Sequence, residues 1–361
     1  QRPLCELWVF ELPEGRLGMI QKTHHCLIDG ISGVDIGTVL LDLTADPPPN
    51  DPAPEWHPAA VPSSERLLVD ALVGRYTKPA EIYRTWRAAT RPQRELARRA
   101  LEIGQGVFSF SRAALERAPI TSLTKPIGPH RRFEVVRMRL EDVKLLKNRF
   151  GCTVNDAVLA IVTGGIRKLL LARGEYLDGL VLKAMVPVSV RDPSQRMTYG
   201  NMVSMMNADL PVGEPDPARR VAFVKERMAG LKESKQAVGA DFWVKLSEYA
   251  PPTILALAGR ATVALQRMVN VIVTNVPGPQ FPLYLKGGQL LEAFPCVPIA
   301  GTASLGIAIL SYNGHLNFGL CGDWDIVADL EVLARGIEES MRELRNAATP
   351  GNVAAERLSI P

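Results

Sequence analysis

The chain has 361 residues, of which 47% are hydrophobic and 22% charged, and its formal net charge is +4. These values are those of an ordinary globular protein with a sizeable core, and they exclude a chain that is disordered along its length. So small a net charge gives no support to nucleic-acid binding. No apolar run reaches the roughly 18 residues of a membrane span, because the best candidate, 294–310, is interrupted by prolines and glycines and predicts buried strands.

The five cysteines are scattered, and no two of them form a CxxC pair. Neither a disulfide framework nor a zinc site is therefore predicted. A reducing, intracellular setting is expected instead. These cysteines are Cys5, Cys26, Cys152, Cys296 and Cys321.

Residues 1–45 predict a compact α/β piece. Two strand-like runs, 4–12 and 17–24, flank Pro-Glu-Gly-Arg and indicate a hairpin. A loop follows at 25–32, and the apolar segment 33–43 is expected to be a helix packed on the strands.

Residues 46–130 predict a linker followed by basic helices. Seven prolines between residues 46 and 64 indicate an extended segment. Helical spacing then runs from 65 to 117, and nine Arg and one Lys stand against four Glu between residues 75 and 117. A solvated helix face is one interpretation, and a patch that meets anionic lipid or phosphate groups is the other.

Residues 131–361 predict a second α/β unit in which strands and helices alternate, so the fold class is α/β with mixed sheets. Gly151 is expected to end the first helix. The predicted strands are 133–140, 181–190, 202–210, 269–274, 290–310 and 315–321, and the predicted helices are 140–150, 153–173, 217–233 and 326–346.

Two adjacent histidines, His24 and His25, end the second strand-like run. Neighbouring side chains on a strand point to opposite faces, so the two are poor ligands for one metal ion. One of them can face a cavity, with Asp29 close by and Gly30 permitting a turn. No G-x-S-x-G elbow is present and nothing marks Cys26 as a nucleophile, which favours a histidine general base. A purely structural role for the histidines is the alternative.

The motif His24-His25-Cys26-Leu27-Ile28-Asp29-Gly30 resembles the HHxxxDG signature of the CoA-dependent acyltransferase superfamily. The wider pattern is similar to one branch of it, the bacterial wax ester synthase/diacylglycerol acyltransferases. That branch carries three further motifs, which occur here in the expected order, and the resemblance spans nearly the whole chain. They are Asn155-Asp156, Gly200-Asn201, and Asn275-Val276-Pro277-Gly278-Pro279.

This resemblance implies a chloramphenicol acetyltransferase-like fold of two subdomains with a tunnel between them. Residues 1–45 would be the C-terminal part of the first subdomain, and 131–361 the second. His25 would be the general base and Asp29 a structural residue that pairs with an arginine. Arg191, after the apolar strand 181–190, is our candidate for that arginine.

The resemblance also implies a reaction, in which a long-chain acyl group passes from acyl-CoA to diacylglycerol or a long-chain alcohol. Asn155 would steady the oxyanion, and the basic helices could meet the phosphates of CoA. Acyl-CoA is a substrate here, and no metal or other cofactor is implied. We expect a cytoplasmic protein, peripheral to a membrane or lipid droplet. A carrier-protein-dependent condensation-type acyltransferase and a non-catalytic lipid-binding relative are the alternatives.

Two departures from the family pattern accompany this resemblance. Pro3-Leu4-Cys5 stands where the family usually has Pro-Leu-Trp, so an aromatic packing residue is absent. Family members also carry a substantial N-terminal part that would complete the first subdomain. We expect activity to need that part, which a separate chain could supply.

Each supporting motif also has a structural interpretation. Thr153 and Asp156 have the spacing of a helix capping box, which alone would explain an Asn-Asp pair there. Gly200-Asn201 is typical of a turn that leads into a strand. For residues 275–279 we favour a turn with a structural role.

Overall fold

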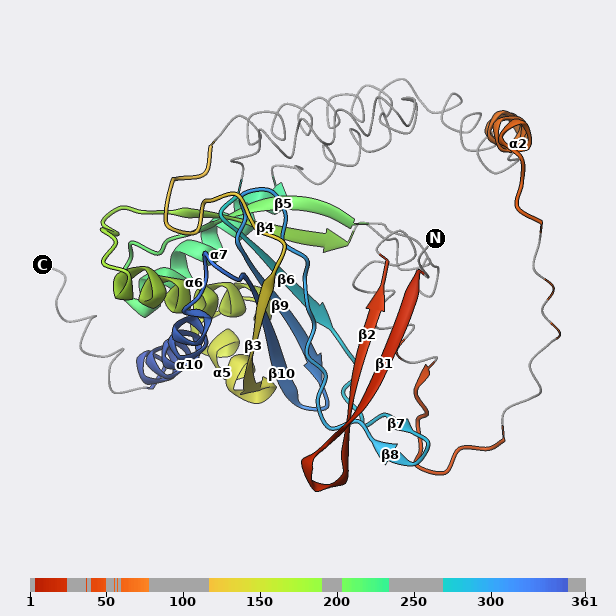
Figure 1. Cartoon of the computed structure of the whole chain (residues 1–361). Coiled ribbons are helices and arrows are strands. Elements are labelled where there is room, and N and C mark those ends of the chain that lie inside the picture. Colours follow the sequence, from red (N-terminus) through yellow and green to blue (C-terminus); the bar gives the residue numbers. More distant parts are fainter. Residues whose placement is uncertain are drawn as a thin grey trace, which may run out of the picture.

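The computed structural model describes residues 4–24, 37, 40–49, 55, 57, 60–77, 117–189, 203–233 and 269–349 (Figure 1). The predicted loop 25–32, most of the predicted helix 33–43 and most of the basic helices lie outside these residues. The first turns of the basic region are described as α2, Ser64–Thr77. No helix within the described ranges is long and apolar enough to cross a membrane.

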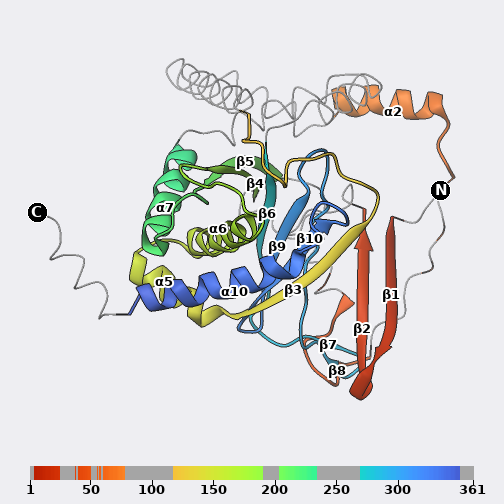
Figure 2. The same ribbon diagram turned by 60° about the vertical axis from the view of Figure 1, so that its left-hand side comes forward.

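The predicted hairpin is confirmed. Strand β1, Cys5–Leu12, pairs antiparallel with β2, Arg16–Thr23, across a short turn at Pro13–Gly15. Many of its apolar side chains are exposed, among them Trp8 at 62%. In both views the hairpin lies on the side of the main sheet away from the large helices (Figures 1 and 2). An apolar ribbon of two strands is marginal in water unless another element covers it.

The core is a mixed sheet of six strands in the order β3-β10-β9-β6-β4-β5. Strands β4, β6 and β9 run parallel, and the other neighbouring pairs are antiparallel. The bounds are Arg131–Arg139 for β3, Leu182–Ser189 for β4, Val203–Leu210 for β5, Val271–Pro277 for β6, Leu305–Tyr312 for β9 and His315–Asp323 for β10. The predicted α/β class with a mixed sheet is confirmed.

In the described part of the chain, the helices α5, α6, α7 and α10 cover one face of this sheet (Figure 2). The most buried is α6, whose residues from Asp156 to Ile166 are all buried. Gly151 ends α5 in the left-handed conformation, with φ of 59°, as its position predicted. The helices are α5 (Leu140–Phe150), α6 (Val154–Ala172), α7 (Pro217–Glu233) and α10 (Leu330–Ala347).

The strand predicted over 290–310 is wrong in its first half. Only β9, from Leu305, is a strand there, and residues 290–304 cross the sheet as an irregular segment. Asn317 of β10 donates a hydrogen bond to the carbonyl oxygen of Ala293 at 3.1 Å. A β-carbon at Gly319 would overlap the carbonyl oxygen of Pro295, so a glycine in the strand permits this close approach. The prolines of the segment suit a covering role, because they cannot donate to a strand ladder.

Two other predicted boundaries shift. The closing helix begins at Leu330, because residues 326–329 form turns. In the predicted helix 33–43, Gly37 and Leu40 are helical, but Asp42 instead forms a β-bridge with Tyr284. Tyr284–Leu285 is strand β7, which pairs with β8, Gly288–Gln289. Asp42 thereby joins the first segment of the chain to the second α/β unit.

Candidate functional site

The Asn155-Asp156 pair lies in the first turn of α6, and its two members do different things. The Thr153 hydroxyl accepts from the Asp156 backbone N–H at 3.1 Å, and Asp156 Oδ2 accepts from the Thr153 N–H at 2.8 Å. This is the predicted capping box, with Asp in place of the usual Glu or Gln. Asp156 is buried and holds the helix end, so its role in the described structure is local.

Asn155 instead faces the sheet. Asn275 Nδ2 donates to Asn155 Oδ1 at 3.4 Å, which joins two of the motifs singled out in the sequence across 120 residues. Both side chains are half-buried. The turn predicted over residues 275–279 is wrong for its first half, because β6 continues as a strand to Pro277. Pro277 and Gly278 therefore mark the place where β6 ends, and the residues before them belong to the strand.

Gly278 is a structural residue at the end of β6. Its N–H donates to Ser311 Oγ at 3.1 Å, and Gln280 Nε2 donates to the same oxygen and to the Gly278 carbonyl. A β-carbon at Gly278 would overlap the Ser311 carbonyl oxygen. Pro277 and Gly278 therefore fix the carboxyl end of β6 against β9, as the structural interpretation predicted.

The carboxyl ends of the parallel strands β4, β6 and β9 form one edge of the sheet, together with the amino end of α6. In open α/β sheets, ligands bind preferentially at this edge. Strand β4 ends there at Ser189, two residues before Arg191 in the sequence. The Asn155–Asn275 pair is the part of the candidate site that the described residues show.

Most of the HHxxxDG motif lies outside the described residues. Its first member, His24, follows β2, where its backbone N–H donates to the Leu4 carbonyl at 2.7 Å and continues the hairpin ladder. The side chain of His24 is exposed. The roles of His25, Asp29, Gly30, Arg191, Gly200 and Asn201, the proposed Asp29–Arg191 ion pair and the tunnel stay predictions. Among the described side chains, no three His, Cys, Asp or Glu residues form a group that could hold a metal ion.

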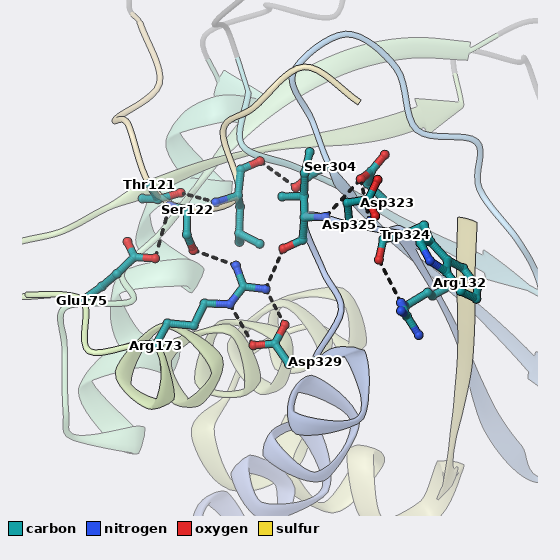
Figure 3. A network of polar contacts seen from close by, with 12 residues as sticks. Thr121, Ser122, Arg132, Arg173, Glu175, Ser304, Asp323, Trp324, Asp325 and Asp329 are labelled. Carbon is teal, nitrogen blue, oxygen red and sulfur yellow. Dashed lines mark hydrogen bonds and ion pairs between the residues drawn. The ribbon is translucent and has the colours of Figure 1, made fainter. Parts of the chain in front are cut away.

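Sequence reasoning missed a polar network at the opposite edge of the sheet (Figure 3). Arg173, at the end of α6, forms a bidentate ion pair with Asp329 before α10. It also donates to Ser122 Oγ at 2.7 Å and to the Ile326 carbonyl at 3.0 Å. The hydrogen bonds from Arg173 lower the pKa of the Asp329 carboxyl below its ordinary value. No local signal could reveal this pair, because 156 residues separate its members.

Comparisons with known proteins agree on one family. The model of the wax ester synthase/diacylglycerol acyltransferase catalytic domain matches residues 1–158, and that of the WS/DGAT C-terminal domain matches residues 199–345. Two probable diacylglycerol O-acyltransferases of Mycobacterium tuberculosis, tgs1 and tgs2, are each 32% identical to the chain. The alignments cover 95% of this chain and 72% of tgs1, and 96% of this chain and 74% of tgs2.

Solved structures confirm the fold. The wax ester synthase/diacylglycerol acyltransferase of Marinobacter aquaeolei VT8 superposes with a TM-score of 0.62 at 23% identity, over 96% of this chain and 73% of that one. The first condensation domain of the calcium-dependent antibiotic synthetase gives a TM-score of 0.51 at 18% identity, over 96% and 68%. The fold class that the sequence motifs predicted is thus confirmed, whereas the division into two subdomains stays a prediction.

Proposed function

Because this chain belongs to the wax ester synthase/diacylglycerol acyltransferase family, and is thus an acyltransferase, we propose that it moves a long-chain acyl group from acyl-CoA to diacylglycerol, a long-chain alcohol or both. The products are triacylglycerol and wax ester. The observation that carries this proposal is the match of the catalytic-domain model across residues 1–158, a range that includes both the HHxxxDG motif and Asn155.

The proposed mechanism is direct transfer with His25 as general base. The neutral imidazole takes the hydroxyl proton of the alcohol as the alcohol oxygen attacks the thioester carbonyl. The carbon–sulfur bond then breaks, and His25 returns the proton to the departing CoA thiolate. General base catalysis of this kind contributes roughly 100- to 10,000-fold. The ester is formed without a covalent enzyme intermediate.

We assign the stabilisation of the oxyanion in this reaction to the side chain of Asn155. Its side chain is half-buried in the first turn of α6, at the edge of the sheet where the parallel strands end. An amide N–H donor stabilises developing negative charge there, and the positive end of the helix dipole adds to the effect. The geometry of Asn155 supports this role, whereas Asp156 binds the Thr153 N–H through Oδ2 as part of the cap.

The protein is proposed to work at the surface of a membrane or lipid droplet on the cytoplasmic side. The excess of arginine between residues 75 and 117 and the apolar nature of the products support this location. The exposed apolar side chains of β1 and β2 support a further partner, a segment N-terminal to residue 1 that covers the hairpin. Sedimentation with anionic vesicles at low salt tests the lipid surface, and failure to sediment would contradict it.

The test of the catalytic proposal is release of free CoA from palmitoyl-CoA by the complete protein. Reactions contain diacylglycerol, hexadecanol or no acceptor, and each is repeated with His25→Ala. The matched control is His57→Ala, because His57 is exposed in the linker beside Glu55 and far from the motif in sequence. We expect acceptor-dependent release that His25→Ala lowers by about 100-fold or more and that His57→Ala leaves within about twofold. Release without dependence on His25 would overturn the mechanism. The absence of release with either acceptor would favour a carrier-bound donor or a lipid-binding role.

A further inference from the structure

Asn275 ends a row of apolar side chains on one face of β6. Alternate residues of a strand share a face, so Asn275 continues the row of Val271 and Val273. Both valines are buried in the core under the helical layer. The row thus ends in an amide where the strand reaches the carboxyl edge of the sheet.

Asn155 interrupts a matching row on α6. Residues three, four and seven positions further along share its side of the helix. These are Val158, Leu159 and Val162, and all three are buried in the same core. The two amides therefore meet at the end of the interface between helix and sheet.

Other asparagines of the sheet are held differently. Asn270, before β6, accepts from the Lys183 N–H at 2.9 Å and donates to the Pro119 carbonyl at 2.7 Å. Asn317 of β10 donates to the Ala293 carbonyl. Both are fully buried and satisfy backbone groups, which is the ordinary structural use of a buried amide. Asn275 contacts another side-chain amide instead, in a half-buried place.

The direction of the hydrogen bond between Asn275 and Asn155 determines how the Asn155 amide is oriented. Asn275 Nδ2 is the donor and Asn155 Oδ1 the acceptor, so the oxygen of Asn155 is turned toward β6. Its Nδ2 group is then the end that points away from Asn275. We propose that Asn275 is a positioning residue for the acyl transfer, which holds the Asn155 amide with its N–H donor toward the reacting carbonyl. This inference rests on the proposed function and gives the first residue of the motif at 275–279 a role in the reaction.

The test is a double-mutant cycle on kcat in the complete enzyme. Asn275→Asp keeps the shape of the side chain but cannot donate, so it turns the Nδ2 group of Asn155 toward itself and the oxygen toward the carbonyl. We expect kcat to fall about 100-fold, in the range seen for loss of one oxyanion donor, with KM for acyl-CoA changed less than about threefold. In an Asn155→Ala background the same substitution should change kcat less than about twofold, because no amide remains to be oriented.

Two further variants keep this test decisive. If Asn275→Asp fails to fold, Asn275→Ala replaces it in the double-mutant cycle. The expected loss of kcat is then smaller, about 10-fold, because the Asn155 amide is free to rotate but is not held in the reversed orientation. Asn270→Asp is the control at the amino end of the same strand. It should lower thermal stability, and its effect on kcat per folded molecule should be small and equal in both backgrounds.

The outcomes separate this inference from the function on which it rests. Equal losses of kcat in the wild-type and Asn155→Ala backgrounds, in an enzyme that needs His25, would overturn the positioning role alone. A change confined to thermal stability would overturn it as well. A wild-type enzyme that releases no CoA in response to an acceptor would overturn the proposed function and the positioning role together.

Discussion

The two edges of the six-stranded sheet are built differently. At the amino ends of β6 and β9, charged and polar side chains bind one another and the backbone, as the Arg173–Asp329 pair and Asn270 do. At the carboxyl ends, the described contacts include a helix cap, one amide pair at 3.4 Å, and the hydrogen bonds of Gly278 and Gln280 to Ser311. The first edge ties distant segments together through a charged pair, whereas the second holds β6 against β9 and also leaves the Asn155–Asn275 amide pair half-buried. Together with the role proposed for Asn155, this contrast leads us to expect that the first edge contributes mainly to stability and the second to the chemistry.

The network at the amino edge also fixes residues 117–124, which lead into the second α/β unit. Ser304 Oγ donates to the Leu123 carbonyl at 2.6 Å, and the Ser122 N–H donates to Glu175 at 3.2 Å (Figure 3). Leu123 is fully buried in the main core. The last part of the segment predicted as linker and helices is therefore packed against the second unit in the described structure.

The largest expected effect of a single change at the carboxyl edge is on rate. Asn155→Ala should lower kcat about 100-fold, because it removes the donor to the oxyanion. The free energy of unfolding should change by less than about 1 kcal/mol, because the contact with Asn275 is long and half-exposed. Steady-state kinetics with palmitoyl-CoA and denaturant unfolding of the same sample measure the two quantities. If Asn155→Ala lowered the free energy of unfolding but left kcat unchanged, the carboxyl edge would contribute to stability and not to the chemistry.

The reciprocal change at the amino edge should act on stability. Asp329→Asn leaves Arg173, which is 15% exposed, without its carboxylate. We expect the free energy of unfolding to fall by about 2 kcal/mol, and kcat per folded molecule to stay within about twofold. A fall in kcat as large as that of Asn155→Ala would show that the two edges are coupled.

The pH dependence of stability sharpens this second prediction. The pKa of Asp329 is lowered in the folded protein, because Arg173 donates to the ionised carboxylate. Its contribution is therefore present above the unfolded pKa of an aspartate, about 4, and is lost as pH falls through the lower folded value. The difference in unfolding free energy between wild type and Asp329→Asn should be constant near pH 7 and shrink below about pH 4. A difference that grows on acidification would contradict the ion pair.

Local signals in the sequence predicted much of this fold. Gly151 marked the end of α5, the spacing of Thr153 and Asp156 marked the start of α6, and alternation marked β3. The covering segment 290–304 was mistaken for a strand, because a run of apolar residues looks alike in the sequence whether it pairs in a ladder or lies across one. Its position depends on Gly319, which lies in the next strand, β10, and not in the segment itself.

The candidate site was predicted as motifs but not as an arrangement. The family resemblance singled out Asn155 and Asn275 separately, and nothing in either motif showed that their amides meet. The turn signals of Pro277 and Gly278 also hid the fact that Asn275 belongs to a strand. The strand assignment matters, because only the alternation of β6 turns Asn275 toward α6.

The smallest expected effect separates the two members of the Asn155-Asp156 pair. Thr153→Ala removes the hydroxyl that accepts from the Asp156 N–H, but the backbone N–H of residue 153 still donates to the Asp156 carboxylate. We therefore expect a loss of only about 1 kcal/mol in unfolding free energy. Thr153→Ser, which keeps the hydroxyl, is the matched control and should lose less.

The rate of Thr153→Ala then distinguishes what holds Asn155. If Asn275 positions the amide, a loosened cap two residues away should lower kcat by less than about threefold, because the contact across to β6 survives. If the cap itself positions Asn155, kcat should fall by about 10-fold or more, and Thr153→Ser should restore it. Since both variants alter the same helix end, a kcat per folded molecule about 10-fold or more lower in Thr153→Ala than in Thr153→Ser would assign the positioning to the cap and contradict the role given to Asn275.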